Sequence, residues 1–311
     1  MFFRYEYGGA IIFDGLYLSD ETFHTNFTAI LDTWLDGQLN DANSVPYHIL
    51  NHEFFRNADA VGDLVGLFPI NYLTRLMTEG DTMAKFNRTA YMELVRVTVE
   101  NYVLGWPETL PDGTFSRNHC DNWPNEPNKN ASYVWADDQF MGVTLLSRFA
   151  VVVNSPKLAE FVATQVVQFA KYLQDPQDGL EYHAFNFATG DHSCCKWSRA
   201  NGWGMMALVE VLNALDNVSA FKNSTLAKQV LDVFQQLSQA MTRHQGSSGL
   251  WHQVRSSVTL QLHTVHRYHK LTCACIFISK LNLLLNQRIR VVASATCHVH
   301  TCRSLQFYEC S

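Results

Sequence analysis

No stretch of this sequence is apolar over the roughly 20 residues that a membrane-spanning helix needs. Basic residues are also scarce: 23 Lys and Arg stand against 29 Asp and Glu, for a net charge of −6. A nucleic-acid-binding surface would require a basic excess. We therefore expect neither a membrane nor a nucleic acid as a partner.

The start of the sequence lacks the charged end and apolar stretch of a signal peptide, since it reads Met1-Phe2-Phe3-Arg4-Tyr5-Glu6. Five Asn-x-Ser/Thr sequons are nevertheless present, which favours a glycoprotein. We expect the full-length form to be secreted or lumenal, and a form without a signal to be cytoplasmic. The sequons begin at Asn26, Asn87, Asn130, Asn217 and Asn223.

The last part of the sequence lacks turn-forming residues and acids. Residues 255–311 contain no Gly, Pro or Asp, and seven basic residues with one acidic residue, whereas five of the eight cysteines lie there. The composition changes abruptly after Val254. We therefore assign residues 1–254 to one domain and treat 255–311 as an atypical tail outside it. An alternative splice, a retained intron or a frame error would account for the tail.

Histidines and cysteines of the tail, such as His263, His266 and Cys297, have the chemistry of zinc ligands. A zinc site must close tetrahedrally, and no Gly or Asp turn is present there to form a knuckle. We therefore expect no metal and no other cofactor.

The body of the chain consists of amphipathic helical patterns, with apolar residues at i, i+3 and i+4 spacing. Ser155 and Pro156 provide a cap and a first-turn proline for one of these helices. Pro69 is expected to bend or break another. The patterns predict helices over 23–34, 65–76, 158–173, 205–215 and 226–241.

Three short motifs recur between these helices. Each contains a glycine in a turn followed by an aromatic residue, and the glycines, Gly113, Gly179 and Gly249, are separated by 66 and 70 residues. That distance holds two helices and their loops, so one helical hairpin per repeat is predicted. Residues 105–133 form a long connection without periodicity, which is typical of a functional or disordered loop.

Two adjacent acids, Asp137 and Asp138, precede an apolar helical run. Either carboxylate is well placed to cap that helix or to interact with its dipole. Alternatively, Asp137 points toward Trp135, where partial shielding from water suits a general acid. On this second interpretation Asp138 is the capping residue.

The segment Lys196–Gly204 contains two tryptophans and an arginine around small residues, and we expect it to form a turn that enters the next helix. Arg199 offers a planar fork for a carboxylate, and Trp197 and Trp203 offer stacking surfaces. The alternative is that both tryptophans are core residues and Arg199 forms a surface ion pair. His183 and Asp63 are further candidates, although a lone histidine is more often structural and an acid before a helix is usually a cap.

Taken together, the segments 134–141, 179–185 and 197–212 resemble glycoside hydrolase family 105, the unsaturated rhamnogalacturonyl hydrolases. The resemblance covers roughly residues 5–254 and implies an all-α fold, an (α/α)6 toroid of helical hairpins. The related family 88, the unsaturated glucuronyl hydrolases, shares this fold and chemistry, and the wording Ala200-Asn201-Gly202-Trp203 favours family 105.

The resemblance implies removal of a 4,5-unsaturated uronic acid from oligosaccharides made by polysaccharide lyases, through hydration of the C4–C5 double bond. It makes Asp137 the catalytic acid and base and Asp63 a supporting acid. The resemblance also implies that no metal takes part. It places five residues around the unsaturated ring: Trp135, His183, Arg199, Trp203 and Trp197.

The tail departs from the family pattern, because a further helical hairpin is expected after Val254. We expect the ring to be incomplete at the C-terminus, which would leave apolar helix faces exposed. The alternative function is therefore a catalytically inactive or unstable variant that acts at most as a carbohydrate-binding remnant.

Overall fold

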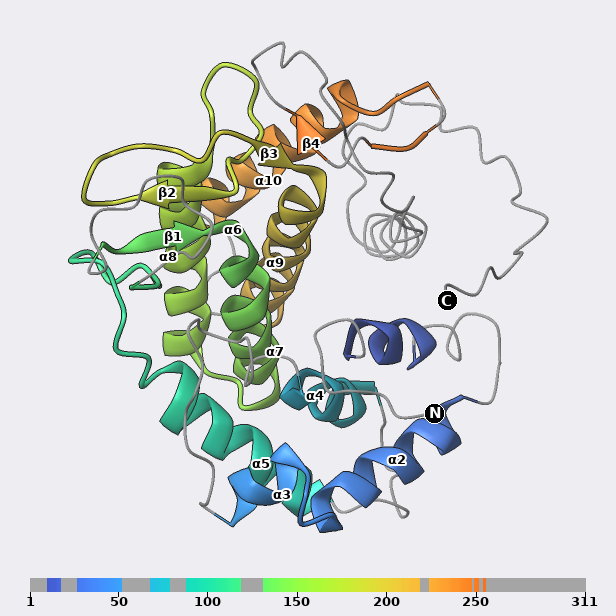
Figure 1. Ribbon diagram of the computed structural model, residues 1–311. Coiled ribbons are helices and arrows are strands. Elements are labelled where there is room, and N and C mark those ends of the chain that lie inside the picture. The colour runs from blue at the N-terminus through green and yellow to red at the C-terminus, as the bar shows by residue number, and fades with distance from the viewer. Residues whose placement is uncertain are drawn as a thin grey trace. The chain divides into compact units, whose positions relative to one another are not determined.

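The computed structural model describes residues 10–17, 27–51, 68–78, 88–118, 131–218, 224–247, 249–251 and 254–255, all within the compact unit Met1–Arg267. Helices predominate (Figure 1). Besides the helical residues 10–17, the elements are α2 (Thr28–Asn40), α3 (Val45–Leu50), α4 (Phe68–Thr78), α5 (Arg88–Thr98), η1 (Val99–Val103), β1 (Tyr133–Trp135), α6 (Ala136–Asp138), η2 (Gln139–Val143), α7 (Thr144–Val152), α8 (Pro156–Leu173), β2 (Ala184–Asn186), β3 (Lys196–Trp197), α9 (Ser198–Asn217), α10 (Thr225–Arg243) and β4 (Val254–Arg255).

Helix-on-helix packing builds the core. Helix α9 packs against α7, α8 and α10, and these four helices run side by side in Figure 1. Helix α4 packs on both α5 and α7, while α3 packs on α2 and α5. Among the described helices, none is both long enough and apolar enough to span a membrane.

The predicted helices are present over the described residues, with one correction at a helix start. Ser155 caps α8 by accepting a hydrogen bond from the Leu158 amide at 3.3 Å, and Pro156 is the first residue of the helix, as predicted. Pro69 is the second residue of α4, where an amide hydrogen needs no helical partner; residues 65–67 of the predicted helix lie outside the described residues, so the expected break at Pro69 stays a prediction. The segment 198–204 is not a turn, because α9 already begins at Ser198.

The three repeat glycines occupy equivalent turns. Gly113, Gly179 and Gly249 have φ values of +86°, +79° and +77°, a region that glycine enters without steric cost. Gln165 of α8 donates to the Gly113 carbonyl at 2.8 Å, and Arg243 of α10 donates to the Asp178 carbonyl at 2.8 Å. The first two turns are therefore each held by a later helix, which supports the predicted hairpin repeat.

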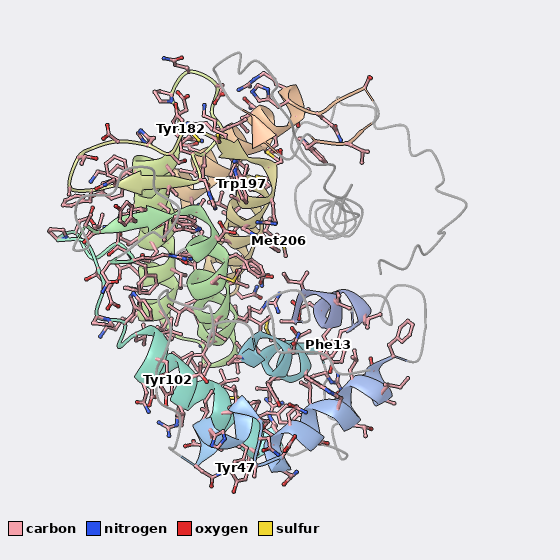
Figure 2. All side chains as sticks on the ribbon, in the orientation of Figure 1. Phe13, Tyr47, Tyr102, Tyr182, Trp197 and Met206 are labelled. Carbon is pink, nitrogen blue, oxygen red and sulfur yellow. The ribbon has the colours of Figure 1, made fainter. Side chains whose placement is uncertain are left out.

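Two short antiparallel ladders lie beside the ends of these helices. Trp135 of β1 pairs with Ala184 of β2, and Trp197 of β3 pairs with Val254 of β4. Between the ladders, the His183 amide donates to the Cys195 carbonyl at 3.3 Å. In Figure 2, Tyr182 and Trp197 lie at the end of α9 that carries the strands. The chain segments that hold the predicted site motifs are thus side by side.

Strand β4 crosses the boundary predicted at Val254, and that boundary stays a prediction. The predicted incompleteness of the ring concerns residues 256–311, which lie outside the described residues.

Candidate active site

Asp137 is the second residue of α6 and directly follows β1 and Ala136. Its Oδ2 lies 2.9 Å from Nε2 of His183, and the two side chains are 17% and 14% exposed. The Ala136 amide donates to the His183 carbonyl at 2.9 Å, so backbone and side chain both join the two segments. An ionised Asp137 accepts a hydrogen bond from Nε2 when that atom carries a hydrogen, whereas a protonated Asp137 donates a hydrogen bond to Nε2. The pair can therefore hold a proton on either side, as acid–base catalysis requires.

The chain directly after Asp137 is π-helical over Gln139–Val143. A π-helical turn inserts an extra residue into a helix and is frequent at functional sites. Here it lies between the short α6, which holds Asp137, and α7. The irregular turn thus sets the direction of the acid relative to the helix below it.

His183 is bracketed by two indole rings. Its ring stacks on Trp197 with centroids 4.5 Å apart and planes 10° apart. It meets Trp135 edge-on at 4.4 Å. Both tryptophans are partly exposed, so they present ring surface beside the Asp137–His183 pair. Four of the predicted site residues are therefore in one cluster.

Arg199 extends this cluster, because its guanidinium lies 5.2 Å from the centroid of the Trp197 ring. It forms no hydrogen bond or ion pair in the part of the chain that the structure describes, although it is only partly exposed. The surface ion pair that the sequence left open is thus not formed among these residues. A guanidinium held over an indole retains its planar fork for a carboxylate ligand.

Trp203 is a core residue, and Asp63 lies outside the described residues. Trp203 is only 7% exposed, and its ring packs against Phe140 at 4.9 Å. That placement matches the core alternative for Trp203. Asp63 lies outside the described residues, so its role as a supporting acid stays a prediction.

Asp138 does not cap a helix with its side chain, contrary to expectation. Trp135 is the N-cap residue of α6, and Asp138 precedes η2 but makes no capping hydrogen bond, because its side chain is fully buried in a bidentate ion pair with Arg117 at 2.6 and 2.9 Å. The Arg117 guanidinium also lies 4.9 Å from the Trp135 ring centroid. A single arginine therefore fixes the residues on both sides of Asp137.

A second buried carboxyl lies behind the site. Glu181 is fully buried and accepts a hydrogen bond from Gln139 Nε2 at 2.7 Å. Burial raises the pKa of Glu181 to about 7. Its backbone is held by Asn201, whose amide side chain accepts from the Glu181 N–H at 2.8 Å and donates to its carbonyl at 2.9 Å. Asn201 thereby joins the start of α9 to the segment that leads to His183.

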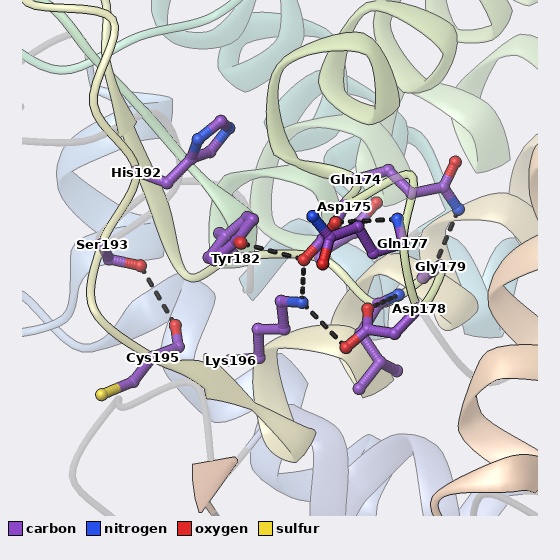
Figure 3. Close-up of polar contacts among 12 residues, drawn as sticks. Gln174, Asp175, Gln177, Asp178, Gly179, Tyr182, His192, Ser193, Cys195 and Lys196 are labelled. Atoms are coloured by element: carbon purple, nitrogen blue, oxygen red, sulfur yellow. Dashed lines mark hydrogen bonds and ion pairs between the residues drawn. The ribbon is translucent and has the colours of Figure 1, made fainter. Parts of the chain in front are cut away.

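A polar cluster anchors the turn before His183 (Figure 3). Lys196 is buried, and its ammonium forms ion pairs with Asp175 and, at 2.8 Å, with Asp178. Tyr182 donates to Asp175 at 2.9 Å, and the Lys196 ammonium lies 4.5 Å from the Tyr182 ring centroid. Burial raises the pKa of Asp175, but hydrogen bonds from Lys196 and Gln177 outweigh it and lower that pKa overall.

These supporting residues were missed at the sequence level for identifiable reasons. Arg117 lies in the long connection without periodicity, where no pattern singles it out. Lys196 and Asn201 lie in the tryptophan motif, the segment Lys196–Gly204. Their closeness to Trp197 in sequence was the signal that could have singled them out. Within the described ranges, no group of three or more His, Cys, Asp or Glu residues could hold a metal ion.

Comparison with known proteins identifies the family of this chain. The family model of Glycosyl Hydrolase Family 88 matches residues 1–296. The unsaturated rhamnogalacturonyl hydrolase YesR of Bacillus subtilis strain 168 is 28% identical over 261 residues, which cover 82% of this chain and 65% of YesR. This chain thus spans just under two thirds of that relative.

Solved structures show the same fold. A possible member of family GH105 from Klebsiella pneumoniae aligns with a TM-score of 0.62 and 19% identity over 80% of this chain and 57% of its own. The unsaturated glucuronyl hydrolase of Bacillus sp. GL1 aligns with a TM-score of 0.50 and 14% identity over 76% and 57%. These enzymes are α/α toroids, so the predicted fold class is confirmed.

The family match extends over almost the whole chain, and the curated relative carries the activity name that the motifs suggested. The predicted resemblance to glycoside hydrolase family 105 is therefore confirmed. The chain belongs to Glycosyl Hydrolase Family 88.

Proposed function

We propose that this chain removes a 4,5-unsaturated uronic acid from the non-reducing end of oligosaccharides produced by polysaccharide lyases. The observation that carries the proposal is the Asp137–His183 pair, with 2.9 Å between Oδ2 and Nε2, beside two partly exposed indole rings. Family membership makes the substrate a carbohydrate, and the name of YesR gives the unsaturated uronyl class.

The first chemical step is protonation of the double bond. Its carbon atoms C4 and C5 form an enol ether with the ring oxygen, so a proton added at C4 leaves positive charge shared between C5 and that oxygen. Asp137 is the donor in this step, and its hydrogen bond to His183 holds the carboxyl group in place. A positioned general acid contributes about 10²–10⁴-fold to such a rate.

Water completes the hydration. It adds to C5 and gives its proton to the Asp137 carboxylate, which restores the acid. The product is a hemiketal at C5, whose ring opens to a C5 ketone. The resulting C1 hemiacetal then releases the remaining oligosaccharide as an alcohol and becomes an aldehyde. The glycosidic oxygen thus leaves without direct displacement at C1, and one carboxyl group serves both proton transfers.

The other residues of the cluster bind the sugar. Trp135 can cover the apolar face of the ring, and Trp197 lines the site with its ring against His183 and Arg199. The Arg199 guanidinium suits the uronic carboxylate, because it has no ion pair in the described residues. Carboxylate recognition by an arginine fork gives both charge and orientation.

Asp137→Asn tests the proposal. The substrate is an unsaturated disaccharide, and its turnover is followed by loss of the ultraviolet absorbance of the conjugated double bond. We expect the variant to lose at least about a hundredfold in kcat, because an amide cannot donate a proton to C4. Asp216→Asn is the matched control, since Asp216 is an exposed acid near the far end of α9. Undiminished turnover by Asp137→Asn would rule the assignment out.

Measurements on the unsubstituted chain test the alternative, an inactive or unstable remnant. A soluble chain that melts cooperatively and turns over the disaccharide excludes it. Binding of the disaccharide without turnover would favour a carbohydrate-binding remnant, and failure to melt cooperatively would favour an unstable variant.

A further inference from the structure

Two adjacent cysteines lie on the segment that leads into the site. Cys194 is exposed, Cys195 is partly buried, and neither forms a disulfide. Their sulfur atoms are 2.6 Å apart. A disulfide bond measures about 2.0 Å, so the two thiols already face each other at close range.

Adjacent residues make an unusual disulfide. Their Cα atoms are about 3.8 Å apart, which is below the usual separation of about 4.4–6.8 Å. A bond formed under this constraint is strained, and strained disulfides are the readily reduced ones that act in regulation. The spacing of Cys194 and Cys195 therefore suits a reversible bond better than a permanent staple.

The pair is joined directly to the residues of the site. The Cys195 carbonyl accepts hydrogen bonds from the His183 amide at 3.3 Å and from Ser193 Oγ at 3.1 Å, the second of which is drawn in Figure 3. Lys196 follows in the anchoring cluster, and Trp197 then stacks on His183. A ring closed through the 194–195 peptide includes the N–Cα bond of Cys195, so it would turn that residue and with it the adjoining Cys195 carbonyl, which accepts from the His183 amide.

We propose that Cys194 and Cys195 are a redox modification site, at which a low-molecular-weight disulfide such as oxidised glutathione closes a vicinal disulfide that displaces His183. Formation of the disulfide does not depend on the proposed function. The effect on turnover rests on the proposed function, because it acts through the contact between His183 and Asp137.

The exchange proceeds in two balanced steps. The thiolate of Cys194, the exposed member, attacks one sulfur of glutathione disulfide and releases one glutathione thiolate. Cys195 then loses its proton to water and attacks Cys194 Sγ, expelling the second glutathione thiolate. Two protein thiols are oxidised and one disulfide is reduced to two thiols. Burial, followed by the Cys194 contact, raises the pKa of the Cys195 thiol to about 11, so little Cys195 thiolate is present near neutral pH and the first attack falls to the exposed Cys194.

Mass spectrometry of the full chain tests the bond itself. Trypsin releases residues 172–196 as one peptide, whose only cysteines are Cys194 and Cys195. After equilibration with oxidised glutathione and alkylation of free thiols, we expect this peptide to be unalkylated and to lack two hydrogen atoms. Dithiothreitol should restore two alkylation sites. In Cys194→Ser and Cys195→Ser, the remaining cysteine cannot form the ring. A peptide that stays doubly alkylated, or that is linked to one of the other six cysteines, would overturn the pair.

Two readouts test the coupling to the site. Oxidation should lower kcat severalfold in the unsubstituted chain and should not change it in Cys194→Ser. Oxidation should also change the tryptophan emission that comes from Trp197, because the Trp197 ring lies against His183. The variant Trp197→Phe lacks this emission and so identifies it. Oxidation without either change would overturn the regulation. If neither redox state turns over the disaccharide, the proposed function fails, while the peptide mass and the emission still decide this inference.

Discussion

Glu181 carries a buried carboxyl group next to the residues of the site. It is fully buried, and its Oε1 and the Oε1 of Gln139 have no hydrogen-bond partner in the described part of the chain. Gln139 supplies its hydrogen bond, but burial dominates and raises the pKa of Glu181 to about 7. The folded chain therefore favours a neutral Glu181.

This carboxyl group makes stability depend on pH with a defined sign. The unfolded chain ionises Glu181 near its ordinary pKa of 4.5, whereas the folded chain keeps the proton up to about 7. Stability from this group is thus complete below about pH 4.5 and is lost as the pH rises through about 7, by on the order of 3 kcal/mol. We expect the melting temperature of Glu181→Gln to change less between these pH values than that of the unsubstituted chain. Parallel profiles for the variant and the unsubstituted chain would contradict the assignment.

Arg199 gives a second prediction at the scale of one residue. If its guanidinium binds the uronic carboxylate, Arg199→Met loses charge-assisted hydrogen bonds of about 1.5–3 kcal/mol. We expect KM for the unsaturated disaccharide to rise about 10–100-fold, with a smaller effect on kcat. The methyl ester of the same disaccharide serves as control, because it lacks the charge. An equal loss on acid and ester would show that Arg199 acts on something other than the carboxylate.

At the scale of elements, helix α9 shows why the tryptophan motif contains glycine. A Cβ atom on Gly204 would lie 2.8 Å from Glu181 Oε2 and 3.3 Å from Gln139 Nε2. The close approach of α9 to the buried Glu181–Gln139 pair thus requires the glycine. Gly37 in α2 is a helical glycine for comparison, where a Cβ atom would be accommodated because it would meet nothing within 4 Å.

Alanine at these two helical glycines should have opposite effects. Gly204→Ala must displace the buried pair, and we expect it to destabilise the fold by about 1–3 kcal/mol. Gly37→Ala only removes backbone freedom from the unfolded chain, and we expect it to stabilise the fold by about 0.5–1 kcal/mol. Urea unfolding of both variants measures the two values. A stabilised Gly204→Ala variant would mean that α9 does not approach Glu181 this closely.

At the scale of the whole molecule, one buried arginine connects four helical segments. Arg148 of α7 forms ion pairs with Asp14 at 2.7 Å and with Glu210 of α9 at 2.8 Å, and donates to Thr74 of α4 at 2.7 Å. Asp14 also accepts from Asn71 of α4 at 3.2 Å. The N-terminal helices are thereby tied to the helices that carry the site.

Removal of Arg148 should therefore loosen the whole fold. Arg148→Met leaves two buried carboxylates without their cation, and we expect a loss of about 3–5 kcal/mol in the free energy of unfolding. A triple variant that adds Asp14→Asn and Glu210→Gln should recover part of this loss, because it removes the unpaired charges. Chemical unfolding followed by circular dichroism compares the two. The network would be unimportant if Arg148→Met unfolded like the unsubstituted chain.

Local sequence patterns were sufficient to predict the helical class, the cap of α8, the glycine turns and the motifs that identify the family, because these depend on short-range periodicity and on residues with restricted backbone preferences. One error, a turn predicted in place of the start of α9, arose at a helix start, where packing decides between helix and turn.

The folded chain was needed to tell which acid faces His183 and which is paired with an arginine. Asp137 and Asp138 are neighbours in sequence, yet one side chain contacts His183 and the other is buried against Arg117. Both partners are distant in the chain, and Arg117 lies in a connection without any pattern. Local sequence cannot specify such contacts, because each depends on how the strands bring remote segments together.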